Sequence, residues 1–198
     1  MPPTPEDEAP LRGLILVGGR SSRMGRDKSQ IAYHGLPEWK RVQELLSRHI
    51  VEVFISVSAK QVDAFDDAPQ IVDRWDKIGP MNGIASALAE YPDSAWFVLA
   101  CDMPALTDNE IERLLQARVV DADATIYCDA EGKREPLCCI YEPSVASRLN
   151  VAIDKGDYSL NRCLQKCKTT ELIVSDGNVL KNVNTPEESE SFGAIDAN

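Results

Sequence analysis

The sequence lacks the features that define several common classes of protein. No window approaches about 18 consecutive apolar residues, and the first ten residues are acidic and rich in proline, unlike a secretion signal. We therefore expect no membrane partner and a cytoplasmic location. Basic residues are in the minority, with 21 Lys and Arg against 32 Asp and Glu and a net charge of -11. Because nucleic-acid phosphates require a basic surface, we expect no nucleic-acid partner either.

The six cysteines lack the spacing of a metal or disulfide framework. No Cys-x-x-Cys pair occurs, and the chain has only two histidines. A structural zinc site or a set of disulfides is therefore not expected, and most of the thiols should be buried. Cys163 and Cys167 are four residues apart on a predicted helix, which places them on one face. We interpret that pair as a packing feature.

The length and apolar content fit a single folded domain. The chain has 198 residues, of which 43% are hydrophobic. That is enough to build a proper core, so we expect one α/β domain over residues 11–198. Residues 1–10 combine several prolines with acids and lack apolar content, which predicts a flexible acidic tail.

Short apolar runs alternate with amphipathic segments along most of the chain, a pattern typical of β-α-β units. A later pair of strands joined by a short turn predicts a hairpin, which reverses one strand. We therefore predict a three-layer α/β sandwich with a mainly parallel, mixed sheet. Strands are predicted over 14–17, 52–58, 70–72, 95–101, 124–128, 137–141 and 169–174. Helices are predicted over 38–50, 84–90, 108–118, 143–155 and 159–168.

A glycine-rich segment follows the first predicted strand. Gly18 and Gly19 lack a Cβ, so their backbone N–H groups can approach an anion closely. Arg20, Arg23 and Lys28 add positive charge to the same stretch of an acidic protein. The segment therefore predicts a cradle for a triphosphate.

Two better-known glycine motifs do not fit this segment. A Walker A loop ends in Gly-Lys-Ser/Thr, but Lys28 follows Asp27. A dinucleotide fingerprint beginning at Gly18 would require glycine where Arg20 and Arg23 stand. Neither an ordinary P-loop nor a dinucleotide site is indicated.

Polar residues follow the other predicted strands. Ser58, Asp73 and Asp102 each come after an apolar run, and ligands collect at the carboxyl ends of strands in open α/β sheets. A separate capping box, Thr107 to Glu110, starts the next helix, so Asp102 is not needed as a cap. A strand-end carboxylate beside a triphosphate favours Mg²⁺. On spacing alone, Asp73 fits a turn residue equally well.

A second glycine loop is predicted at 79–83, where Gly83 would give backbone access to an uncharged wall of the pocket. Near the C-terminus, Asn184 precedes a predicted helix cap and has two interpretations. It either reaches back into the cleft or is an ordinary turn asparagine.

Gly18 to Lys28 reads Gly-Gly-x-Ser-x-Arg-Met-Gly-x-Asp-Lys, which resembles the signature of the MobA-like molybdenum cofactor guanylyltransferases. The stretches 79–83 and 182–188 are similar to this family as well, and Glu135-Pro136-Leu137 resembles its segment near the acceptor. The resemblance implies a Rossmann-like nucleotidyltransferase fold. It further implies GTP and a phosphorylated pterin as substrates, with attack of the molybdopterin phosphate on the α-phosphorus of GTP. Other proteins of cofactor biosynthesis or molybdoenzyme maturation are expected partners.

The same resemblance, joined to the residue analysis, assigns roles to particular positions. Arg23, Lys28 and Asp102 are the expected catalytic residues, with Mg²⁺ held by Asp102. Substrate binding is expected at Leu16, Val17, Gly18, Gly19, Lys28, Ser58, Asp73, Gly83, Asp102 and Asn184. Three alternatives stay open: a CTP-dependent enzyme, another small-phosphate nucleotidyltransferase, and a nucleotide-binding module without turnover. The cytosine alternative arises because Val17 stands where the family usually has alanine.

Overall fold

The computed structural model describes residues 8–17, 36–65, 68–174 and 176–183. Seven strands form one sheet in the order β3-β2-β1-β4-β6-β5-β7. Only β6 is antiparallel to its neighbours, so the prediction of a mainly parallel sheet with one reversed strand is confirmed. The strands are β1 (Leu11–Leu16), β2 (Val53–Val57), β3 (Gln70–Val72), β4 (Ala95–Ala100), β5 (Ala124–Cys128), β6 (Arg134–Tyr141) and β7 (Thr169–Ile173).

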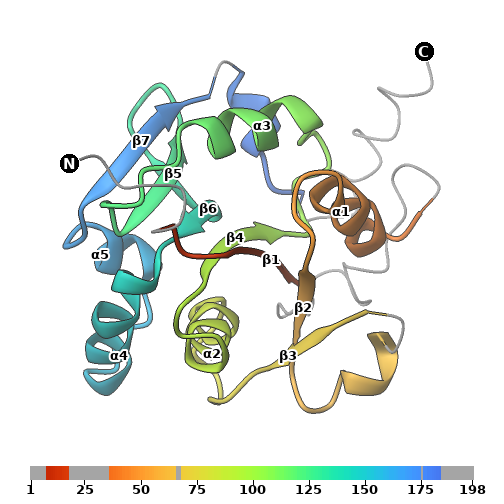
Figure 1. The fold of residues 1–198 in the computed structure, drawn as a ribbon, viewed down its shortest axis with the longest axis vertical. Helices are drawn as coiled ribbons and strands as arrows, with labels where there is room; N and C mark the ends of the chain where they lie inside the picture. Colours follow the sequence, from red (N-terminus) through yellow and green to blue (C-terminus); the bar gives the residue numbers. More distant parts are fainter. Residues whose placement is uncertain (1–7, 18–35, 66–67, 175, 184–198) are drawn as a thin grey trace.

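Helices cover both faces of this sheet, which confirms the three-layer sandwich. Figure 1 shows α1 and α3 on one side and α2, α4 and α5 on the other. No helix among the described residues is long and apolar enough to cross a membrane. The α-helices are α1 (Glu38–Ser47), α2 (Met81–Glu90), α3 (Asp108–Gln116), α4 (Ala146–Asp154) and α5 (Leu160–Leu164). Short 3-10 turns are η4 (Val62–Phe65), η5 (Pro143–Val145) and η6 (Gly177–Leu180).

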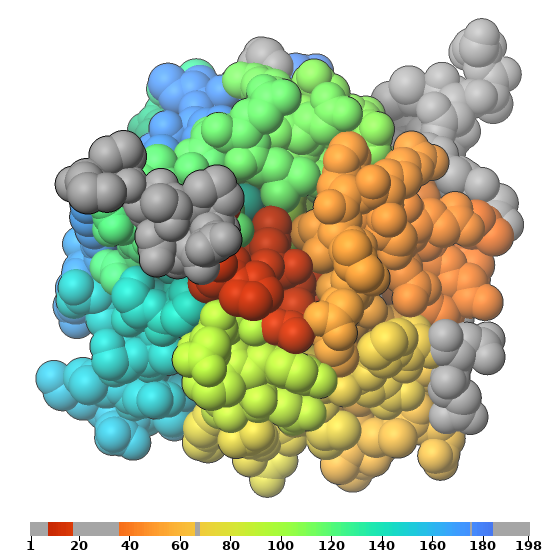
Figure 2. All heavy atoms as spheres, viewed as in Figure 1, coloured from red at the N-terminus to blue at the C-terminus, as the bar shows by residue number. Residues whose placement is uncertain are grey.

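The central strand β1 divides its side chains between two cores. Leu14 and Leu16 pack with α2, whereas Ile15 and Val17 pack with α1, as the alternation of a strand requires. The segment that contains β1, red in Figure 2, lies at the centre of one face of the molecule, between the α1–β2 and α2 segments. Trp39 is 4% exposed and meets Phe65 edge to face in the core on the α1 side of the sheet.

Most differences from the predicted elements are shifts of their ends. β1 starts at Leu11 instead of Leu14, because its parallel pairing with β4 extends to Ala95. α1 ends at Ser47 and α5 at Leu164, both earlier than predicted. The capping box of α3 is present as predicted. The division into a tail over 1–10 and one domain over 11–198 remains a prediction.

The predicted loop at 79–83 is wrong, because α2 already begins at Met81. Gly79 has a φ of 64°, which supplies the turn, but Gly83 is a buried helical residue. A Cβ at Gly83 would lie 2.2 Å from Ser56 Oγ and 2.8 Å from Leu16 Cδ2. The glycine therefore lets α2 lie close to β1 and β2, and its role in substrate binding stays a prediction.

Replacement of Gly83 by alanine tests this packing. The added methyl group would press on Ser56 and Leu16, and overpacking of this kind costs about 2 kcal/mol of unfolding free energy. Urea unfolding should show that loss. Gly177→Ala is the matched control, since nothing lies within 4 Å of a Cβ there. Equal stability of the two variants would contradict the close packing of α2.

Candidate nucleotide site

The order of the sheet contains a reversal between β1 and β4, the place at which open α/β sheets have a crevice. β1 pairs with β2 on one side and with β4 on the other, and all three are parallel. The chain after β1 and the chain after β4 therefore leave the sheet side by side, with Leu16 opposite Ala100. In open α/β sheets, this reversal of strand order is where ligands bind. Gly18, Gly19, Arg23 and Lys28 follow β1 in the sequence but lie outside the described residues, so their roles remain predictions.

Leu16 and Val17, at the end of β1, offer only backbone groups to this crevice. Leu16 is 6% exposed and packs against the α2 side, and Val17 is 4% exposed and packs against the α1 side. The Leu16 carbonyl already accepts a hydrogen bond from the Cys101 amide at 3.4 Å. The bulk of Val17 therefore lies in the core and gives no reason to expect cytosine in place of guanine.

Asp102 stands at the end of β4, where the sequence predicts it. Its backbone carbonyl accepts a hydrogen bond of 2.8 Å from the Val183 amide, so the end of the described chain returns to this point. The Oδ1 atom of Asp102 is shielded from solvent. Asn184 follows Val183 in the sequence but lies outside the described residues, so its proposed reach into the cleft stays untested.

The reversed strand β6 brings a second carboxylate toward Asp102. The antiparallel register pairs Leu99 with Cys138 near the end of β4, and Glu135 lies three residues before Cys138, toward the edge of the sheet at which Asp102 follows β4. Burial raises the pKa of Glu135, a hydrogen bond from the Leu137 amide opposes this shift, and the charge of Asp102 raises the pKa further. The two carboxylates therefore interact electrostatically at the carboxyl edge of the sheet.

This pair fits Mg²⁺, which takes one or two carboxylates together with phosphate oxygens. A cation between Asp102 and Glu135 would relieve the repulsion that raises the pKa of Glu135. Analysis of the sequence identified Asp102 and linked Glu135 only to the acceptor side. The pair can be predicted only when β4 and β6 are known to be neighbouring strands, because their pairing brings Glu135 toward Asp102.

A different group of potential metal ligands joins α1 to α3. His49, Asp108 and Glu112 bring one ligand atom each to within 4.8 Å of one another. His49 Nε2 is 3.0 Å from Asp108 Oδ1, and Arg48 lies 3.6 Å from the same oxygen. A mixed imidazole and carboxylate set with an arginine beside it does not match the all-oxygen preference of Mg²⁺. The carboxylates at the sheet edge fit that ion better.

Two cavities flank the start of β6. One has a volume of about 340 Å³ and the other about 240 Å³, and both are lined by Lys133, Arg134 and Glu135. η6 and the chain after it complete the first cavity, and the approach to α5, including Tyr158, completes the second. Cationic, carboxylate and aromatic groups thus meet beside the Asp102–Glu135 pair. This side of the crevice can hold a phosphorylated molecule with a ring.

Ser58 and Asp73 lie at the ends of β2 and β3, on the other side of β1. The Ser58 hydroxyl donates to Gln61 Oε1 at 2.7 Å and so is used within its own turn. Asp73 accepts a hydrogen bond of 2.9 Å from the Ser56 hydroxyl, the group that stands against Gly83. Burial raises the pKa of Asp73, and the bond from Ser56 only partly offsets that effect. Burial thus disfavours the charged form of the Asp73 carboxylate, which lies beside the crevice.

A crevice at the reversal of strand order, with a carboxylate pair at its edge, defines a doubly wound α/β protein of the nucleotide-binding class. The comparison with known sequences narrows this class. Residues 13–171 match the MobA-like NTP transferase domain, and the chain belongs to that family.

Named relatives agree with this assignment. The chain is 31% identical to the molybdenum cofactor guanylyltransferase of Vibrio atlanticus, over 92% of this chain and 95% of that protein. It is 35% identical to the molybdenum cofactor biosynthesis bifunctional protein of Synechocystis, where the match covers 91% of this chain but 53% of that protein.

A solved structure shares the fold as well. Molybdopterin-guanine dinucleotide biosynthesis protein A from Archaeoglobus fulgidus superposes with a TM-score of 0.80 at 24% identity. The superposition covers 94% of this chain and 98% of that one.

The raised pKa of Asp73 leads to a test by substitution. The folded state holds the Asp73 proton more tightly than the unfolded chain does. The charged form of Asp73 therefore lowers the free energy of unfolding above the folded pKa. The wild-type protein regains this free energy as the pH falls and Asp73 takes up its proton. Asp73→Asn keeps the acceptor for Ser56 and removes the charge. We expect a higher Tm than wild type at neutral pH and a gap that narrows toward about pH 4. The exposed Asp76→Asn control should show no such gap, and a constant gap for Asp73→Asn would refute the assignment.

Proposed function

We propose that the protein transfers GMP from GTP to the terminal phosphate of molybdopterin and releases pyrophosphate. The main observation in support is the place of Asp102, at the end of β4 and beside the end of β1, where the Gly18–Lys28 sequence begins. The activities in the names of the relatives support the choice of substrates. Asp102 and Glu135 are the carboxylates that would hold Mg²⁺.

The chemistry of this transfer needs little from a general base. A phosphate oxygen of the acceptor is already ionised at neutral pH and attacks the α-phosphorus of GTP. The new P–O bond forms as the bond between the α-phosphorus and the bridging oxygen breaks, and pyrophosphate leaves with the electron pair. Arg23, Lys28 and the amides of Gly18 and Gly19 are assigned to neutralise and orient the phosphates. When bound, Mg²⁺ supplies further neutralisation of the charge on the leaving pyrophosphate.

The two cavities beside β6 suit the acceptor. Lys133 and Arg134 bring positive charge for its phosphate, although Arg134 also pairs with Glu171. Tyr158 is 44% exposed and offers a ring against which a pterin can pack. Asn184 is assigned to the same side, next to Val183. The site is thus divided into a nucleotide half after β1 and an acceptor half around β6.

Other assignments belong to the same proposal. Asp73 and Ser58 are placed at the nucleotide side of the crevice, at the ends of β3 and β2. We expect the reaction to take place in the cytoplasm, where its product would pass to other proteins of cofactor biosynthesis or molybdoenzyme maturation. The rival substrates are CTP as the nucleotide donor and another small phosphate as the acceptor.

Nucleotide preference is the first test. With Mg²⁺ present, GTP should raise the Tm of the protein more than CTP, UTP or ATP does, and it should be the NTP that releases pyrophosphate with molybdopterin. Equal or larger effects of CTP would move the protein to the cytosine branch. Stabilisation by GTP without pyrophosphate release would favour a binding module over an enzyme.

The carboxylate pair is the second test. Asp102→Asn keeps the shape but removes the negative charge that attracts Mg²⁺, so kcat should fall roughly 100-fold or more, a loss typical of one preorganised electrostatic group. Glu135→Gln should raise the Mg²⁺ concentration that gives half the maximal rate by about tenfold, which is the effect expected when a group that supports a metal site is removed.

Direct binding separates this role from a loss of folding. Both variants should keep a normal melting curve, and Mn²⁺ titrated in place of Mg²⁺ should bind each of them more weakly by electron paramagnetic resonance. Glu131→Gln, an exposed change in the β5–β6 turn, is the matched control and should behave as wild type. Normal Mn²⁺ affinity in Asp102→Asn would remove Asp102 from the metal site.

A further inference from the structure

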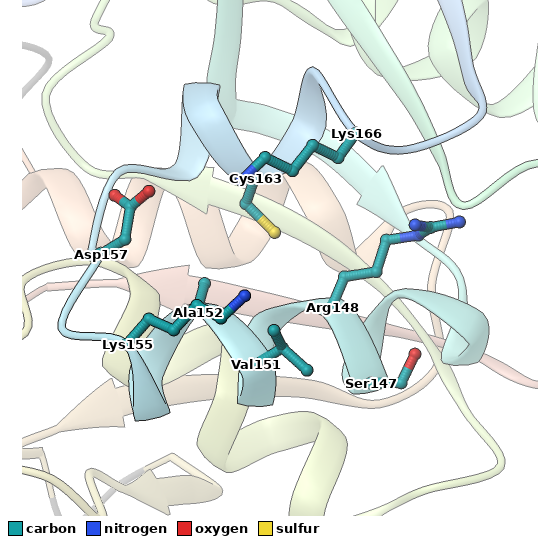
Figure 3. Close-up of a pocket in the computed structure, with 8 residues that line it drawn as sticks. All are labelled: Ser147, Arg148, Val151, Ala152, Lys155, Asp157, Cys163 and Lys166. Carbon is teal, nitrogen blue, oxygen red and sulfur yellow. The ribbon is translucent and has the colours of Figure 1, made fainter.

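A cavity separate from the nucleotide crevice lies between α4 and α5. Its volume is about 340 Å³, and Figure 3 shows the side chains that border it. α4 contributes one wall and α5 with the turn after it contributes the other. The lining residues are Ser147, Arg148, Val151, Ala152, Lys155, Asp157, Cys163 and Lys166.

Positive charge predominates around this cavity. Arg148, Lys155 and Lys166 are the cations, and Asp157 is the one acid in the lining. Arg148 is paired with Asp123 at 3.2 Å, which leaves the two lysines as the main source of positive charge. Asp157 is already paired with Arg162 at 2.6 Å. Among the ion pairs of the described residues, none involves Lys155 or Lys166. In a protein with a net charge of -11, such a cavity attracts small anions.

One thiol lines the cavity, and a second lies close to it in the chain. The sulfur of Cys163 points from α5 toward α4 (Figure 3). Cys167 lies just beyond the end of α5, and its thiol donates to the Cys163 carbonyl at 3.3 Å. The Cys167 thiol beside it lowers the pKa of Cys163, burial opposes the shift, and the nearby charges of Lys166 and Arg148 lower the pKa further, whereas the same contact and burial raise the pKa of Cys167. Cys163 belongs to a core cluster and Cys167 packs against it, which confirms the predicted packing role, and Cys163 also lines the cavity.

Four other cysteines are buried as Cys163 is, but none of them lines this cavity. Cys101, Cys128, Cys138 and Cys139 are all buried in the core of the sheet. Burial raises the pKa of Cys128 to about 11, and it raises those of Cys138 and Cys139 more strongly. Because the thiolate is the nucleophile, reactivity should concentrate on Cys163.

We propose that this cavity is a site for small, negatively charged disulfides, which react with Cys163 and leave a disulfide between Cys163 and Cys167. The Cys163 thiolate attacks one sulfur of the small disulfide, a mixed disulfide forms, and one small thiolate leaves. The Cys167 thiol then loses its proton to solvent and attacks the Cys163 sulfur, which expels the second thiolate. In total, two protein thiols are oxidised and one small disulfide is reduced to two thiols. The proposal does not depend on the nucleotide chemistry.

The rate and charge preference of the reaction provide the test, with three probes of different charge. Oxidised glutathione is negatively charged, hydroxyethyl disulfide is neutral and cystamine is positively charged. With the native protein at neutral pH, oxidised glutathione should form the Cys163–Cys167 disulfide about tenfold faster than hydroxyethyl disulfide, as a charged cleft favours an anion. Peptide mapping by mass spectrometry identifies the bond. Equal rates for the three probes would overturn the site.

Variants assign the roles of individual residues. Lys155→Glu with Lys166→Glu should remove the preference for glutathione, whereas Lys60→Glu, an exposed change between β2 and η4, should keep it. Cys167→Ser should stop at the mixed disulfide on Cys163. Cys163→Ser should leave no mixed disulfide, and its melting curve shows whether it is folded. Persistent oxidation at other cysteines, or a mixed disulfide that persists in wild type, would also refute the proposal.

Discussion

The placement of β1 is the constraint on which the rest of the described structure depends. This strand is hydrogen-bonded along both edges, to β2 and to β4, and its side chains fill a core on each face. A shift of one residue would exchange Leu14 and Leu16 with Ile15 and Val17 and so move every side chain to the wrong core. The same pairing sets the end of β1 beside the end of β4. Core packing and the position of Asp102 are therefore fixed by one register.

Sequence patterns predicted the fold well where burial alone determines the structure. Strands covered on both faces are continuous apolar runs, and such runs at β2, β4 and β5 mark the strands directly. The start of α2 was missed for a physical reason. Glycine serves both tight turns and close helix packing. Gly79 forms the turn, whereas Gly83 allows the close packing of α2. Only the neighbours of each glycine in space distinguish the two uses.

The site could be predicted only in part, because its residues depend on different kinds of information. Asp102 is visible from the sequence, because it directly follows an apolar strand and the next helix has a cap of its own. To predict its partner Glu135, one has to know the pairing of two strands that are more than thirty residues apart in the chain. Cys163 and Cys167 show a helical spacing, but their relation to Lys166 and Arg148 depends on how α4 and α5 pack. Long-range pairing and helix packing are not encoded in local patterns.

The reversed direction of β6 has a consequence for how this protein tolerates insertions. The strands that run the other way deliver to the crevice the residues that follow them, whereas β6 delivers the residues with which it begins. The β5–β6 turn, with exposed residues such as Glu131 and Gly132, is the kind of surface loop in which length usually varies freely. Residues added in this turn leave Glu135 in place as long as β6 keeps its pairing with β4. A residue added between Glu135 and Cys138 would instead rotate Glu135 to the opposite face of the strand. Chain length can therefore vary before Glu135 but not between Glu135 and the paired part of β6.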